Sequence, residues 1–203
     1  VLRAAYSPFH GPDYDVHLGA TLQGVLDPAD TTAGPVKTQA IRLQERPESR
    51  VTGVRLVDTG ALVANGVTVY GLETGASWGP LYAVGEWFKL DVDRTAVGTA
   101  ASPFNPSFSG WYAQGSYALT GERHVWSSAS GGFRGLKPSR PLDFANGAYG
   151  AIEVAARFSR LDLNDRAGSF GAATPVGGVR GGTQDITSLG LNWYPNNTVR
   201  FLL

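Results

Sequence analysis

The sequence predicts an all-β protein, folded as an antiparallel, up-and-down transmembrane β-barrel. The chain has 203 residues with 27 Gly and 12 Pro, and only 17% of its residues are charged, a composition typical of strands and turns. Several segments alternate between apolar and polar side chains, as strands with two different faces do. These segments are joined alternately by tight turns and long polar loops, which is the pattern of membrane barrels.

The clearest alternation lies in residues 109–122. Trp111 and Tyr117 fall on one face together with small or apolar residues, and Tyr112, Gln114 and Ser116 fall on the other. Aromatic side chains near strand ends are typical of barrel strands, which place them at the two bilayer interfaces.

The same reading applied along the chain gives ten expected strands. They are residues 1–7, 16–25, 38–45, 51–58, 67–77, 81–92, 109–122, 149–163, 185–194 and 199–203. We expect tight turns at 79–80 and 195–197, and loops at 27–37, 59–66, 93–107, 123–146 and 164–184. The first strand follows no turn and the last is short, so we expect residues 1–203 to form one partial barrel domain, truncated at both ends.

The composition also excludes several classes of site. The chain has no Cys, which excludes disulfides and thiolate metal sites, and its His10, His17 and His124 are scattered. Seventeen basic and seventeen acidic residues balance, so no global field favours nucleic acid. No apolar run approaches the roughly 18 residues of a membrane-spanning helix. We expect no cofactor, no metal and no catalysis, because no nucleophile, base and orienting group can be placed together.

Six motifs resemble the phosphate-selective porin O/P family of Gram-negative outer membranes, and the resemblance spans nearly the whole chain. They are LVDTG at 56–60, YGLE at 70–73, SFSGWY at 107–112, GSYALTGE at 115–122, EVAARFSRLDLND at 153–165 and LGLNWYP at 189–195. The resemblance implies a sixteen-stranded, usually trimeric barrel of which this chain holds about nine to ten strands. It also implies an outer-membrane location, contact with lipid and lipopolysaccharide, and passage of small anions such as phosphate or polyphosphate.

In the family pattern two strands follow the Trp-Tyr-Pro turn, and counting back makes residues 1–7 similar to the sixth strand. The family's anion selectivity resides largely in an inward-folded loop before that strand and in neighbouring strands. The resemblance therefore assigns no phosphate ligand to this chain.

Charged and amide side chains on the polar faces are the candidates for lining the pore, since rings of such groups set ion selectivity in channels. They are Arg3, Arg42, Arg46, Arg55, Glu73, Glu86, Gln114, Glu153, Arg157, Asn192 and Arg200. Arg42, Arg46 and Arg55, with Arg3, are the best candidates for an anion-conducting wall. A plainer reading is that Arg157 pairs with Glu153, and that Glu45 and Glu48 neutralise the neighbouring arginines.

The apolar faces carry the candidates for membrane-interface aromatics, Trp78, Trp87, Trp111, Tyr117, Phe158 and Trp193. We expect Asp91, Asp93, Asp162 and Asp165 to be solvated strand ends rather than a divalent-cation site, because their spacing matches no calcium loop. The chain is thus expected to be part of a passive channel for small anions. Two alternatives stay open: a non-conductive outer-membrane barrel that binds a partner, and a soluble carbohydrate-binding β-sandwich whose Trp111 and Trp193 faces pack together.

Overall fold

The computed structural model describes residues 1–28, 39–48, 53–94 and 104–203, and it confirms an all-β fold with an antiparallel, up-and-down sheet. The strands are β1 (Leu2–His10), β2 (Tyr14–Val25), β3 (Ala40–Glu45), β4 (Val57–Trp78), β5 (Leu81–Arg94), β6 (Ser107–Ala118), β7 (Trp126–Ser127), β8 (Gly132–Phe133), β9 (Ala151–Asp165), β10 (Val179–Tyr194) and β11 (Phe201–Leu202). In the described parts of the chain, helix is limited to the 3-10 turn η1 (Phe144–Asn146). No described helix is long and apolar enough to cross a membrane.

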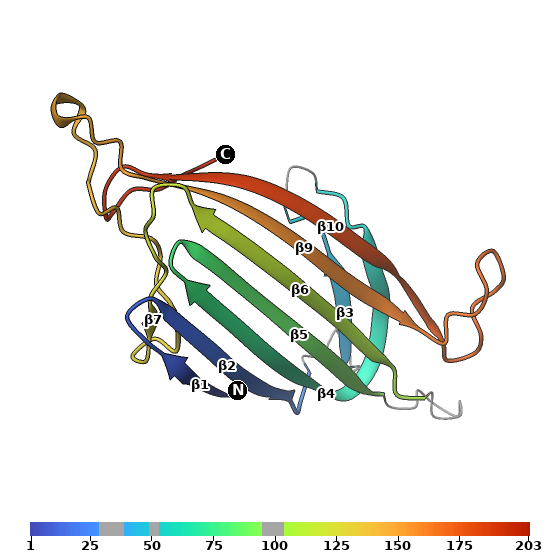
Figure 1. Cartoon of the computed structure of the whole chain (residues 1–203). Coiled ribbons are helices and arrows are strands. Elements are labelled where there is room, and N and C mark those ends of the chain that lie inside the picture. The colour runs from blue at the N-terminus through green and yellow to red at the C-terminus, as the bar shows by residue number, and fades with distance from the viewer. Residues whose placement is uncertain (29–38, 49–52, 95–103) are drawn as a thin grey trace.

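The main sheet has the order β1-β2-β4-β5-β6-β9-β10-β11, and β3 pairs with β4 off this path. It forms one strongly curved wall, with β1 and β11 at its two edges (Figure 1). The β4–β5 turn at 79–80 is confirmed: Gly79 has a φ of +50°, a left-handed conformation that glycine adopts without a steric penalty.

Two of the ten predicted strands are not part of this wall. β3 contacts only the first part of β4. Of the predicted strand at 51–58, residues 53–56 are not strand, 57–58 are the start of β4, and 51–52 lie outside the described residues. Among the described residues, eight strands form the wall.

The loop predicted at 59–66 is also wrong, because β4 runs without a break through these residues. Thr59-Gly60 and Asn65-Gly66 resemble turn signals, but they lie at irregularities in the pairing with β3 and β5. Gly60 has a φ of +68° there. These are β-bulges, which bend a strand instead of ending it.

Other predicted boundaries shift by a few residues. β1 continues past Pro8, where the register with β2 slips between Tyr6 and Phe9. Proline is tolerated at such a bulge in an edge strand because no ladder N–H is needed there. β10 begins at Val179 rather than 185, with a second slip between Arg180 and Thr183. β6 ends at Ala118, before the predicted 122.

Cross-strand pairing divides the wall into two faces. We call the inner face the side that carries Glu73, Glu86, Tyr112, Gln114 and Arg157, which lie opposite one another or in step on neighbouring strands. The outer face carries large apolar side chains that are exposed, among them Leu72, Trp87, Trp111, Tyr117 and Leu189. No second sheet covers the outer face in the described residues, so the sandwich alternative is wrong.

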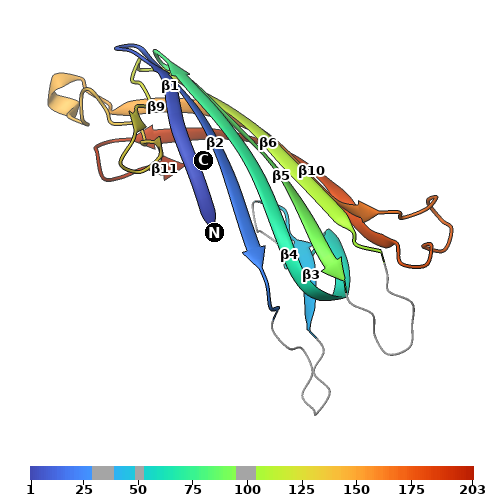
Figure 2. The same cartoon turned by 90° about the horizontal axis from the view of Figure 1, so that it is seen from below.

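The inner face is crossed from one end by a segment that we call the inward arm, residues 40–48 and 53–64. The arm folds back from the bend of β4, as Figures 1 and 2 show. Its Val57, Leu62 and Ala64 are buried against wall residues, forming a cluster with Val92, Phe108, Leu163 and Val179. Burying a side chain of this size contributes about 1.5–3 kcal/mol, so apolar contact holds the arm on the wall.

From the opposite end the inner face is crossed by residues 122–136, which contain β7 and β8 and which we call the inner hairpin. The β6–β9 connection that holds it starts at the same end of the wall as the tight turn at 79–80, since Leu81 pairs with Tyr117 and Ala118 with Glu153. One of the connections at the short-turn end is therefore long, and Figure 1 shows it passing toward β1 and β2.

Candidate pore-lining site

The inner face between the arm and the hairpin holds a row of polar side chains from β4, β5, β6 and β9. Glu73 lies opposite Glu86, and Glu86 lies opposite Tyr112. The two carboxylates have separate partners: the Tyr112 hydroxyl donates to Glu86 at 2.7 Å, and Arg3 forms an ion pair with Glu73. These partners limit the repulsion between two like charges on adjacent strands.

Arg157 lies at the centre of this row and is held on three sides. Its guanidinium stacks over the Tyr112 ring at 3.6 Å from the centroid. Nε donates to Glu48 at 3.1 Å and Nη1 to the side-chain oxygen of Gln114 at 3.4 Å. The expected pairing of Arg157 with Glu153 is wrong, because Glu48 of the arm is the acidic partner of Arg157.

Glu153 is buried at the short-turn end of β9, with 3% of its surface exposed. Its carboxylate accepts hydrogen bonds from the Ser116 hydroxyl, from Asn192 Nδ2 at 2.9 Å and from the Tyr194 hydroxyl at 3.0 Å. It also faces Nε2 of His124, 2.7 Å away. Charge-assisted hydrogen bonds of this kind compensate for the burial of a carboxylate.

The arm presents three arginines. Arg42 pairs with Asp58, and Arg55 donates to the backbone oxygen of Gln44 at 3.4 Å. The Arg46 side chain is half-buried and lines a cavity with Glu48 and Arg157. Within the described residues, neither Arg46 nor Arg55 is found in an ion pair, so neutralisation of the arm by neighbouring acids is partial.

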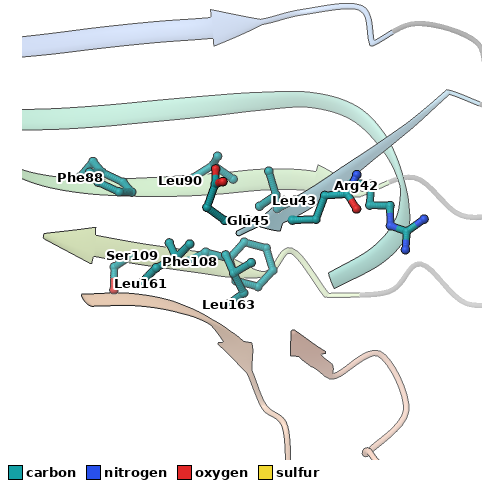
Figure 3. Close-up of a pocket in the computed structure, with 10 residues that line it drawn as sticks. Arg42, Leu43, Glu45, Phe88, Leu90, Phe108, Ser109, Leu161 and Leu163 are labelled. Carbon is teal, nitrogen blue, oxygen red and sulfur yellow. The ribbon is translucent and has the colours of Figure 1, made fainter. Parts of the chain in front are cut away.

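A cavity of about 310 Å³ separates the arm from the wall. Figure 3 shows that Leu43 of the arm faces Leu90 and Phe108 across it, while the Arg42 guanidinium points away. Leucine and phenylalanine side chains form most of the cavity wall, to which Arg42 and Glu45 of the arm also contribute.

The predicted interface aromatics fall on the outer face. Trp78 is 73% exposed, Trp87 lies opposite Trp111, and Tyr117 lies opposite Leu81. Phe158 and Trp193 are half-buried: Phe158 packs on Trp111 and Trp193 stacks on Phe201, each at 5.3 Å between ring centroids.

The remaining predicted residues lie apart from this row. Arg200 is exposed, precedes β11 and interacts with the Tyr194 hydroxyl. The aspartates at the strand ends have protein partners instead of one another: Asp91 pairs with Lys89 at 2.9 Å, and Asp165 accepts from the Ser107 N–H at 2.7 Å. In the described residues no group of three or more acidic or histidine side chains could hold a metal ion.

Sequence reasoning missed the inner hairpin. Trp126 stacks on His17 of β2 at 4.2 Å between ring centroids, and Arg123 pairs with Asp15 at 2.8 Å. His124 stacks on Tyr82 at 4.4 Å. The only sequence signal was a histidine with two aromatic residues, Trp126 and Phe133, inside an otherwise polar loop.

The base of the hairpin is held by Glu122. Burial raises the pKa of this carboxyl, but hydrogen bonds from Thr120 and Ser139 outweigh it and lower the pKa below its usual range. A lowered pKa stabilises the folded loop above the unfolded value of about 4.3, and this contribution is lost as the pH falls through the folded value. We expect Glu122→Gln to cost about 1 kcal/mol at pH 7 and to reduce the acid sensitivity of residues 120–139.

Hydrogen exchange of these amides, corrected for intrinsic rates, measures this effect between pH 7 and pH 3. Thr120→Ala in the same assay removes one donor and keeps the carboxylate, and should weaken the loop less than Glu122→Gln. Equal acid sensitivity of the wild type and Glu122→Gln would contradict the prediction.

A curved up-and-down sheet with a polar inner face, an exposed apolar outer face and segments folded across the inner face defines a protein of the outer-membrane porin class. The model of the phosphate-selective porin O and P family matches residues 1–203. The chain belongs to this family.

Two similar proteins support this assignment. The chain is 32% identical over 201 residues to a protein of Caulobacter vibrioides described as uncharacterized, covering 99% of this chain and 35% of that protein. It is 31% identical over 135 residues to Porin O of Pseudomonas aeruginosa, covering 66% of this chain and 28% of that protein. The chain thus spans about a third of the length of these relatives. Family membership indicates a porin rather than an enzyme, and an outer-membrane location in a Gram-negative bacterium.

Proposed function

We propose that the intact protein containing this chain is a passive channel for small anions, with phosphate or polyphosphate as its solute. The observation that carries this proposal is the inward arm, which brings Arg42, Arg46 and Arg55 over the inner face while Arg46 and Arg55 stay out of ion pairs in the described residues. Cationic side chains along a water-filled path attract anions. Arginine also matches the geometry of phosphate oxygens through two parallel N–H groups.

Several parts of the proposal rest on family membership together with the two faces of the wall. The exposed apolar residues of the outer face contact outer-membrane lipid, with Trp78, Trp87 and Trp111 near the bilayer interfaces. The intact protein assembles as a homotrimer and contacts lipopolysaccharide. The inner-face residues Glu73, Glu86 and Gln114 line the water-filled path, whereas Asn192 is buried and donates to the buried Glu153.

The test is single-channel conductance of the intact protein in a planar bilayer, with the reversal potential measured in a chloride gradient. We expect a reversal potential of the sign that anion selectivity gives, and a current that added phosphate partly blocks. Open channels without anion preference would contradict the anion proposal.

The second candidate is a non-conductive barrel that binds a partner. The observation in its favour is that both the arm and the inner hairpin occupy the inner face. Protein that folds and inserts yet gives no current in the same bilayers would favour this candidate over the channel.

A further inference from the structure

Both ring nitrogens of His124 in the inner hairpin face hydrogen-bond acceptors. Nε2 lies 2.7 Å from Glu153 Oε1, and Nδ1 lies 2.9 Å from the backbone oxygen of Arg134. A neutral imidazole carries a single N–H and can donate only one hydrogen bond. When Glu153 is ionised, the docked geometry is therefore complete only if His124 is the doubly protonated imidazolium.

The surroundings of Glu153 favour the arrangement in which the proton lies on His124. The Ser116 hydroxyl, Asn192 Nδ2 and the Tyr194 hydroxyl all lie within hydrogen-bond distance of this carboxylate as donors. A carboxylate is an acceptor only. These three donors, together with His124 Nε2, favour the ionised form of Glu153.

The rest of the surroundings also suit a cation at His124. Tyr82 of β5 stacks on the imidazole at 4.4 Å and supplies an aromatic face. The Arg134 guanidinium, on the hairpin itself, is turned toward Ser127 Oγ at 3.1 Å. Arg200 lies beyond Tyr194, with whose hydroxyl it interacts. Of the described charged groups around the ring, Glu153 is the one in direct contact.

His17 of β2, which lies beneath the hairpin, differs from His124 in its hydrogen bonds. Its Nε2 lies 3.0 Å from Glu73 Oε1, whereas its buried Nδ1 has no hydrogen-bond partner among the described residues. The neutral form of His17 can make this contact. Of the two, only His124 loses a hydrogen bond when it loses a proton.

We propose that His124 and Glu153 form a proton-controlled contact that docks the inner hairpin on the inner face. At low pH the imidazolium holds the hairpin against β5 and β9. When His124 loses a proton, the ion pair and one of two hydrogen bonds are lost, and docking of the hairpin weakens, while the Arg123–Asp15 pair and the Trp126–His17 stack remain. Because the docked form binds the extra proton, docking strengthens as the pH falls and weakens by up to tenfold per pH unit as the pH rises.

The first test measures docking directly and does not depend on conduction. In the intact protein, hydrogen exchange of residues 122–136, corrected for intrinsic rates, should show protection that falls at least tenfold between pH 6.5 and pH 8.5. His124→Gln, which keeps one donor and cannot be charged, should give protection that is lower and independent of pH. His10→Gln, at an exposed histidine of β1, is the matched control and should behave like the wild type.

The second test uses a covalent link between hairpin and wall. A Cβ at Gly131 would lie 3.6 Å from Ala5 Cβ, within the range for a disulfide, and the chain has no other Cys. Gly131 has a φ of +59°, so the Ala5→Cys/Gly131→Cys variant carries some backbone strain. Partial closures of the reduced channel should become about tenfold more frequent between pH 6.5 and pH 8.5, and oxidation should abolish this change.

The conductance readout rests on the proposed function, whereas the exchange readout does not. If protection depends on pH but the protein gives no current, the result would support the proposed His124 contact and contradict the proposed channel function. Equal pH dependence in the wild type and in His124→Gln would overturn the contact, whether or not the protein conducts.

Discussion

Replacing Arg46 by glutamate should lower the ratio of anion to cation permeability of the intact channel roughly thirtyfold at low salt. The Arg46 side chain of the arm lines the same cavity as Arg157 of β9 and forms no ion pair in the described residues. The substitution therefore alters charge more than packing. A unit charge about 8 Å from a permeating ion contributes roughly 0.5 kcal/mol in water. The substitution changes the charge by two units and acts with opposite sign on anions and cations, so the permeability ratio changes by roughly 2 kcal/mol. Reversal potentials at low and high salt would measure the effect, which should weaken at high salt because ions screen it.

Arg46→Lys is the matched control, because it keeps the charge and loses the planar guanidinium. We expect chloride selectivity to persist and block by phosphate to weaken, since lysine cannot donate two parallel N–H bonds. If Arg46→Glu leaves the reversal potential unchanged, the arm does not contribute to selectivity.

Replacing Leu189 by arginine should destabilise the folded protein in a bilayer by about 2–4 kcal/mol, the cost of a cation on the lipid side of a barrel near the midplane. Leu189 is 82% exposed on the outer face of β10, four residues before Trp193. Denaturant titration of the intact protein in lipid vesicles measures this loss.

The adjacent Ser188 gives the control, because it lies on the inner face opposite Arg157. Ser188→Arg adds the same side chain on the same strand, yet it should cost less than about 1 kcal/mol since water solvates charges in a lumen. Equal losses for the two variants would show that the outer face does not contact lipid.

The wall was predictable because a strand with two different faces alternates with a period of two. This alternation located β2, β5, β9 and most of β10, and it separated Trp111 and Tyr117 from Tyr112 and Gln114. β4 was divided wrongly because Thr59-Gly60 and Asn65-Gly66 have the composition of turns, whereas their effect is to bend a strand whose Val57, Leu62 and Ala64 are buried.

The site was predictable only where it lies on wall strands. Glu73, Glu86 and Arg157 each lie on the polar face of their own strand. The pairing of neighbouring strands then places these three faces on the same side of the wall. The partners of these residues were not predictable, because Glu48 and His124 lie in irregular segments whose side chains do not alternate. Glu48 contacts Arg157 and His124 contacts Glu153, and both contacts join segments far apart in the sequence. Apolar burial of the arm and aromatic stacking of the hairpin decide these contacts, and neither leaves a periodic trace in the sequence.

The arm and the hairpin cross the inner face from opposite ends, so a solute that follows this face meets them one after the other. Two narrow passages in sequence behave as electrical resistances in series: the narrower one sets the total current, while each retains its own preference among ions. In the proposed channel, selectivity and throughput are therefore separable, and a change that widens one passage increases the current only until the other becomes limiting.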